Sequence, residues 1–281
     1  MAINSRRPST DTTARQFKNV PEASGQRDYE VQNGIVEMNR QTTAPEIHRP
    51  WPPPKSPWVL AMRWHDLLFL HWPVRPELLR PFIPAELALD TFDGWAWIGI
   101  VPFHMTGVRL RFMPGMAFPE LNVRTYVKTA GKNGVWFFSL DAASKLAVRA
   151  ARFLGLPYFD AHMTVEPGDE TVLYRSLRIH RKAPPAEFDA TYRPTGPVYH
   201  SASESLDRWL TARYCLYAAR GRRVVYGEID HPPWPLQPAE LDLRVNTMAK
   251  PLAIALPNTK PLLHFARRLD VVAWPIVPLQ K

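Results

Sequence analysis

The segment 118–127 alternates polar and apolar residues, so one face of the strand that it predicts carries side chains that could do chemistry. These are Glu120, Asn122, Arg124 and Tyr126. An arginine can hold a carboxylate through two parallel hydrogen bonds, and a buried glutamate can act as a general acid or base. If this face points into the protein, its side chains line a polar site. The alternation alone, however, favours an outward, solvated face.

A second segment, 158–165, repeats the alternation. It places Tyr158, Asp160, His162 and Thr164 on one face. Because an aspartate two positions from a histidine can orient the imidazole, His162 is a candidate catalytic base. The same spacing is also common on exposed strands, so the segment supports a lined pocket without requiring one.

A lysine and a pair of histidines are candidates for covalent catalysis and for metal binding, respectively. Lys145 follows the apolar run 135–140 at the start of a predicted helix, where a desolvated lysine could form a Schiff base, although exposed helical lysines are commoner. His65 and His71 lie about 20 Å apart in an extended strand and cannot share a metal. Since no zinc, nucleotide or serine-hydrolase motif occurs, we expect no metal and no cofactor.

The net charge of +9 and the pI of about 9.8 allow acidic partners. The basic residues are scattered, and no nucleic-acid-binding motif is present, so we expect a small polar or anionic metabolite and no nucleic acid. No signal peptide and no apolar run long enough to cross a membrane is visible, and Cys215 stands alone. We therefore expect a cytoplasmic protein without a membrane partner; whether it forms a homo-oligomer is left open.

Hydrophobic periodicity predicts a polar, disordered tail over residues 1–50 and a single mostly-β domain over 51–281. Helices are expected over 76–81, over 141–154 with Asp141 as the N-cap, and over 201–213 with a capping box at Ser201 and Glu204. The expected strands are 58–72, 95–105, 120–128, 134–140, 157–166, 171–181, 211–218, 223–230, 240–248 and 262–274. Such a series favours a barrel or a sandwich.

Six separated motifs resemble the YqjF-like family of uncharacterised conserved proteins, a family of unknown function. They are 64–74, 120–126, 136–141, 213–217, 231–236 and 263–270. That family in turn resembles the acetoacetate decarboxylase superfamily. The resemblance implies a closed β-barrel or double-sheet domain with a few helices and an internal pocket.

The decarboxylases use a buried lysine at the start of a helix, assisted by a second lysine, a strand glutamate and a first-strand arginine. By resemblance, Glu120 matches the glutamate and Arg63 lies near the place of the arginine. The lysine pair is not matched, because residues 141–143 stand in its place and Lys145 comes about one helical turn later. The resemblance therefore implies an inherited pocket without Schiff-base decarboxylation.

Together these observations predict a protein that binds or transforms a small polar or anionic metabolite. The predicted acid–base residues are Glu120, Asp141 and His162, and the predicted substrate-binding residues are Asn122, Arg124, Tyr126, Tyr158 and Arg63. Whether the protein is an enzyme stays open. A non-catalytic binding module is one alternative; a protein-interaction scaffold that uses exposed Trp and Pro segments such as 231–235 is another, and it predicts an apolar surface patch.

Overall fold

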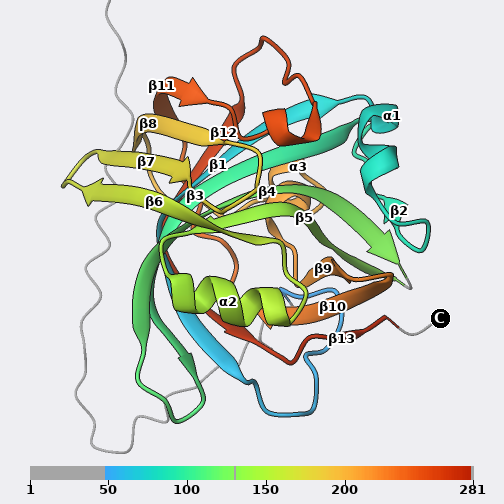
Figure 1. Cartoon of the computed structure of the whole chain (residues 1–281). Helices are drawn as coiled ribbons and strands as arrows, with labels where there is room; N and C mark the ends of the chain where they lie inside the picture. Colours follow the sequence, from blue (N-terminus) through green and yellow to red (C-terminus); the bar gives the residue numbers. More distant parts are fainter. Residues whose placement is uncertain (1–47, 130, 280–281) are drawn as a thin grey trace, which may run out of the picture. The chain divides into compact units, whose positions relative to one another are not determined.

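Seven strands close into a ring in the computed structural model, which describes residues 48–129 and 131–279 (Figure 1). Around the ring, β4 pairs with β5, then β9, β10, β12, β1 and β3 follow, and β3 returns to β4. All of these pairs are antiparallel except β5 with β9. The strands are β1 (Leu60–Val74), β3 (Ala96–Leu110), β4 (Met116–Thr129), β5 (Lys132–Ala142), β9 (Cys215–Arg220), β10 (Arg223–Asp230) and β12 (Leu262–Ala273). The predicted closed, mostly-β architecture is confirmed.

A second sheet branches from the ring where β6 pairs in parallel with the end of β5. It consists of β6 (Tyr158–Pro167), β7 (Val172–Arg178), β8 (Glu187–Pro194) and β11 (Ala239–Asn246). Leu121 and Val123 of β4 pack against Tyr174 and Phe188 of this sheet, so their face is the outside of the ring. Because side chains alternate along a strand, the residues between them face the ring interior.

The remaining strands and helices are short, and they cover edges and ends of the ring. They are β2 (Ala88–Leu89), β13 (Val277–Pro278), α1 (Pro76–Leu79), α2 (Lys145–Phe153), α3 (Leu206–Thr211) and the 3-10 turns η1 (Arg80–Phe82) and η2 (Lys250–Leu252). Leu210 of α3 packs on Trp97, Tyr126 and Val135, which closes one end of the interior. Within the described ranges, no helix has the length and apolar character needed to cross a membrane.

Two predicted helix starts are wrong. The helix α2 begins after Ser144, whose side chain accepts a hydrogen bond from the backbone N–H of Ala147, and α3 begins after Ser205. Asp141 is therefore no N-cap, and it lies in β5 instead, while Ser201 and Glu204 form no capping box. The nearer serines win because their hydroxyls reach the free N–H groups of the first turn.

The strand β8 was not predicted from the sequence. Phe188, Ala190 and Tyr192 of β8 alternate with exposed or half-buried residues, which is the pattern of a strand with one core-facing side. On α2, Val148 faces the core, whereas Leu146 and Phe153 are exposed.

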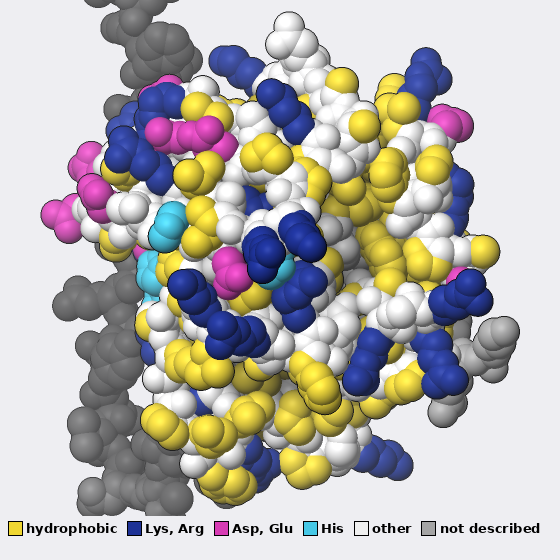
Figure 2. All heavy atoms as spheres, in the orientation of Figure 1, with side chains coloured by type: hydrophobic (Ala, Val, Ile, Leu, Met, Phe, Trp, Pro, Cys, Tyr) yellow, Lys and Arg dark blue, Asp and Glu magenta, His cyan; other side chains and the backbone are white. Residues whose placement is uncertain are grey.

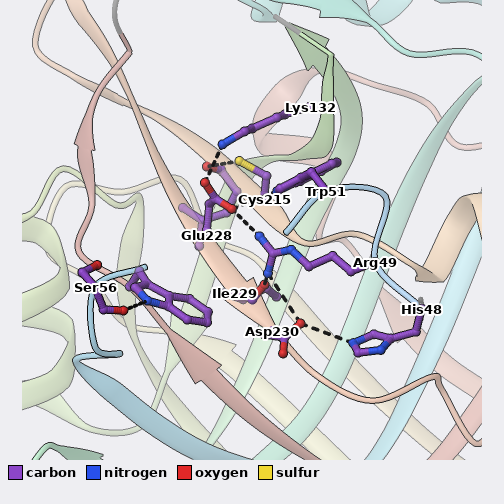
Figure 3. Close-up of polar contacts among 11 residues, drawn as sticks. His48, Arg49, Trp51, Ser56, Lys132, Cys215, Glu228, Ile229 and Asp230 are labelled. Atoms are coloured by element: carbon purple, nitrogen blue, oxygen red, sulfur yellow. Dashed lines mark hydrogen bonds and ion pairs between the residues drawn. The ribbon is translucent and has the colours of Figure 1, made fainter. Parts of the chain in front are cut away.

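Contacts of the folded unit begin before residue 51, while residues 1–47 of the predicted tail lie outside the described residues. The Arg49 side chain is buried and forms an ion pair with Glu228 (Figure 3). The same carboxylate accepts hydrogen bonds from Lys132 Nζ at 2.5 Å and from Trp51 Nε1 at 2.9 Å. Segment 48–51 is thus fastened to β10 and to the start of β5.

The parallel pairing of β5 with β9 is expected to be the part of the ring that is most sensitive to substitution. A Cβ atom at Gly134 would lie 2.3 Å from the carbonyl oxygen of Cys215, so Gly134→Ala must push the two strands apart. We expect a loss of about 3 kcal/mol in the free energy of unfolding, measured by urea denaturation. In Gly227→Ala the new methyl meets the flexible Ile276 side chain at 3.1 Å, so the loss should be smaller. Equal losses would contradict the prediction.

Candidate functional site

The polar face of β4 points into the ring. Its four side chains are buried, with exposed fractions of 4% for Glu120, 4% for Asn122, 9% for Arg124 and 0% for Tyr126. Both faces of this strand are therefore buried, the apolar face against the second sheet and the polar face inside the ring. Buried polar groups require partners, so the contacts of each side chain decide what the interior can hold.

Arg124 is a buried cation for which the described part of the chain provides no anion. Among the residues that the structure describes, no carboxylate lies within salt-bridge distance of its guanidinium, and its Nε atom has no hydrogen-bond partner. The guanidinium carbon lies 5.1 Å from the ring centroid of Phe69. By contrast, the buried Arg178 and Arg213 pair with Asp141 at 2.8 Å and Asp90 at 2.7 Å. An uncompensated interior charge is costly, and an anionic ligand would remove that cost.

A neutral histidine–tyrosine pair adjoins Arg124. The Tyr126 hydroxyl lies 2.6 Å from His71 Nε2. Burial lowers the pKa of His71 well below its usual value, and the charge of Arg124 lowers it further, so the imidazole is neutral at pH 7. A Cβ atom at Gly99 would lie 3.1 Å from the His71 ring and 3.4 Å from Arg124 Cγ. Gly99 thus leaves the space in which both side chains lie.

Glu120 and Tyr158 form a second group on the inner face. The Tyr158 hydroxyl donates a hydrogen bond of 2.6 Å to Glu120 Oε2. Burial raises the pKa of Glu120 to about 7, the tyrosine hydrogen bond opposes this rise, and the negative charge of Asp141 adds to it. A carboxyl group with a pKa near 7 exchanges its proton at neutral pH, as a general acid or base must.

Asp141 lies behind this group rather than within it. It stands opposite Leu121 in the β4–β5 ladder, on the outer face, and Arg178 donates hydrogen bonds to both of its oxygens. Burial raises the pKa of Asp141 to about 6, and Arg178 opposes that rise, so the carboxyl group is mainly ionised at pH 7. From this position Asp141 acts on Glu120 through its negative charge, which raises the pKa of Glu120.

Other predicted residues lie elsewhere. His162 is exposed on β6, and Arg63 forms a surface ion pair with Asp270 at 2.7 Å. Lys145 is exposed on α2. Figure 2 shows many Lys and Arg side chains on the face of the molecule where Figure 1 places α2. In fact no lysine within residues 48–129 and 131–279 is buried, and no three His, Cys, Asp or Glu side chains there gather into a metal site.

Sequence reasoning considered His71 only as a metal ligand and did not single out Gly99 or His264 as members of the site. His71 belongs to β1 and Gly99 to β3, and only strand pairing places both beside Arg124. The available signal was the polar His71 within a long apolar strand, which predicts a buried polar partner.

The ring, the branching sheet and the buried polar row define a protein with the acetoacetate decarboxylase-like fold. The enduracididine biosynthesis enzyme MppR, solved in complex with pyruvate, matches with a TM-score of 0.54 at 10% identity, over 82% of this chain and 92% of that one. An acetoacetate decarboxylase-like enzyme from Sphingomonas wittichii matches with a TM-score of 0.54 at 11% identity, over 80% of this chain and 95% of that one.

The chain belongs to a family described as "Uncharacterized conserved protein", whose model matches residues 61–270. It is 45% identical over 228 residues to the uncharacterized protein YqjF of Bacillus subtilis. The aligned region covers 79% of this chain and 93% of that protein. The family resemblance seen in the sequence is therefore confirmed.

Glu120 should make stability depend on pH. Because its pKa is higher in the folded protein than the usual 4.5, the folded state holds the proton longer, and this group's contribution to stability falls as pH rises from about 4.5 to about 7. Glu120→Gln lacks this penalty. We expect its free energy of unfolding, relative to wild type, to increase by up to roughly 3 kcal/mol between pH 5 and pH 8. The exposed Glu166→Gln is the control; a relative stability of Glu120→Gln that does not change with pH would refute the prediction.

The two buried arginines Arg124 and Arg178 should respond oppositely to the same substitution. Arg178→Met strands the fully buried Asp141, so we expect a loss of about 3 kcal/mol in the free energy of unfolding. Arg124→Met strands no protein carboxylate, and we expect the ligand-free protein to gain about 1 kcal/mol. Chemical denaturation at pH 8 measures both, and a large loss in Arg124→Met would show that the guanidinium has a structural partner.

Proposed function

We propose that the protein binds a small carboxylate inside its strand ring and acts on it by proton transfer. The observation that carries this proposal is the buried Arg124 guanidinium, for which the described residues supply no carboxylate. A carboxylate ligand would accept two parallel hydrogen bonds from the guanidinium and neutralise its charge.

The rest of the inner face supports a polar ligand of more than one functional group. Asn122 lies between Arg124 and Glu120 on β4, and its side-chain oxygen has no hydrogen-bond partner within the described part of the chain. Glu120 contributes a carboxyl group whose pKa of about 7 suits both protonation and deprotonation of a bound molecule. One strand, β4, thus carries the cation that would bind the carboxylate (Arg124), a central polar contact (Asn122) and an acid–base group (Glu120).

Two alternative functions have less support. Schiff-base chemistry needs a desolvated lysine, and every lysine in the described ranges is at least partly exposed. The scaffold hypothesis takes the segment 231–235 as exposed, yet Trp234 is only 5% exposed and His231 only 2%. A buried tryptophan cannot form the apolar patch that this hypothesis requires.

Pyruvate is a suitable first probe, because MppR was solved with it and because it carries one carboxylate. We expect isothermal titration calorimetry to detect pyruvate binding that Arg124→Met abolishes, and methyl pyruvate, which lacks the charge, to bind at least about tenfold more weakly. His162→Leu, at an exposed position, should bind like wild type. Equal binding of pyruvate by wild type and Arg124→Met would overturn the proposal.

Proton transfer is tested on the same ligand. In D₂O, a general base near the bound molecule should exchange the methyl protons of pyruvate for deuterium, and NMR would follow the loss of the methyl signal. We expect Glu120→Gln to lower the exchange rate by about a hundredfold, the lower limit of a general-base contribution. Borohydride should trap no lysine adduct. Binding without Glu120-dependent exchange would instead identify a non-catalytic binding module.

A further inference from the structure

Two buried imidazoles on the inner face each keep one nitrogen for which the described residues offer no partner. His71 lies on β1 and His264 on β12, diagonal to each other because Phe69 stands opposite His264 in the ladder. Their ring centroids are 6.3 Å apart, and the residues are 0% and 2% exposed. In both rings the free atom is Nδ1, which finds no hydrogen-bond partner among the described residues. Two buried rings at this distance, each with an orphaned nitrogen, suggest one shared partner.

The contact of His71 makes its Nδ1 a donor. Tyr126 lies 2.6 Å away at Nε2, and the phenol is neutral, because burial raises its pKa above the usual value. Arg124 donates a hydrogen bond to the phenol oxygen, which leaves the phenol hydrogen for His71, so we assign the hydrogen bond as donated by the Tyr126 hydroxyl to Nε2. A neutral imidazole carries one proton on nitrogen. Because Nε2 accepts the hydrogen bond from Tyr126, that proton lies on Nδ1.

The contact of His264 makes its Nδ1 an acceptor. Asp207 Oδ1 lies 2.9 Å from Nε2 and accepts a hydrogen bond from it. Burial lowers the pKa of His264, so the imidazole is neutral and its one proton lies on Nε2. The Tyr199 hydroxyl donates a hydrogen bond of 3.0 Å to the other oxygen of Asp207 and holds the carboxylate in place. The lone pair of His264 Nδ1 is thus available as an acceptor, with no donor among residues 48–129 and 131–279.

We propose that His71 and His264 bind a hydroxyl group of the ligand whose carboxylate Arg124 holds, so that the substrate class is a small hydroxy acid. This inference rests on the proposed function. A hydroxyl accepts from one nitrogen and donates to the other, which satisfies both. A keto oxygen only accepts and would leave His264 Nδ1 unpaired, while an ammonium group only donates and would leave the His71 N–H unpaired. Arg124 and His71 both lie beside Gly99, so the side chains assigned to the carboxylate and to the hydroxyl are neighbours.

The test compares lactate with propanoate, which has the same charge and lacks only the hydroxyl. We expect calorimetry to show that lactate binds at least about tenfold more tightly, since propanoate leaves a buried donor and acceptor unpaired. In His264→Leu the preference should disappear while propanoate binding stays, and in Arg124→Met neither acid should bind. His162→Leu should keep the preference.

The outcomes separate the two proposals. If both acids bind through Arg124 with equal affinity, the hydroxyl assignment is overturned and the carboxylate site stands. If neither acid binds, both proposals fail. A second measurement uses only wild-type protein: long-range ¹H–¹⁵N NMR should find the proton of His71 on Nδ1 and that of His264 on Nε2, and lactate but not propanoate should shift both Nδ1 signals. A proton on His264 Nδ1 would overturn the assignment even if His264→Leu does not fold.

Discussion

The unpaired charge of Arg124 is the constraint on which the interior of this protein depends. A buried guanidinium usually brings its own carboxylate, as Arg178 and Arg213 do here. Arg124 instead has neutral groups as neighbours among the described residues: the Phe69 ring, the His71 imidazole and the Tyr126 hydroxyl, to which it donates a hydrogen bond. Folding therefore has to hold a charge that the described residues do not neutralise, and stability in the rest of the ring must offset that cost. Such a balance is typical of a binding site rather than of a structural ion pair.

The ring architecture explains how one strand can carry both a core and a site. The second sheet covers the apolar side of β4, and closure of the ring turns the other side inward. With both sides shielded from water, electrostatic effects are large: burial raises the pKa of Glu120 to about 7, and the charge of Asp141 acts on it from the opposite side of the sheet. The two carboxyl groups thus differ in protonation, because within the described ranges Asp141 has an arginine partner and Glu120 has none.

Part of this could be predicted from residues alone. Period-two alternation located β4 and its four polar side chains, and the motif resemblance indicated the closed fold. Local signals were weaker where several candidates competed: Ser144 and Ser205 cap the helices in place of Asp141 and Ser201, because capping depends on the hydroxyl reaching a backbone N–H, which spacing alone does not decide. The strand β8 was missed although its residues 188–192 alternate, since polar residues and prolines around it also fit a loop.

The order of residues in 118–127 was enough to show which side chains share a face of β4, because alternation along an extended strand is a local property of the backbone. Which face is buried was decided by tertiary structure, since burial depends on the second sheet and on closure through β5 and β9. Tertiary structure also decided which residues contact the polar side chains of β4. His71, Gly99 and His264 come to the inner face from three other positions in the ring, and Asp141 finds Arg178 only across two sheets. Those contacts are long-range, so no spacing along the chain could reveal them.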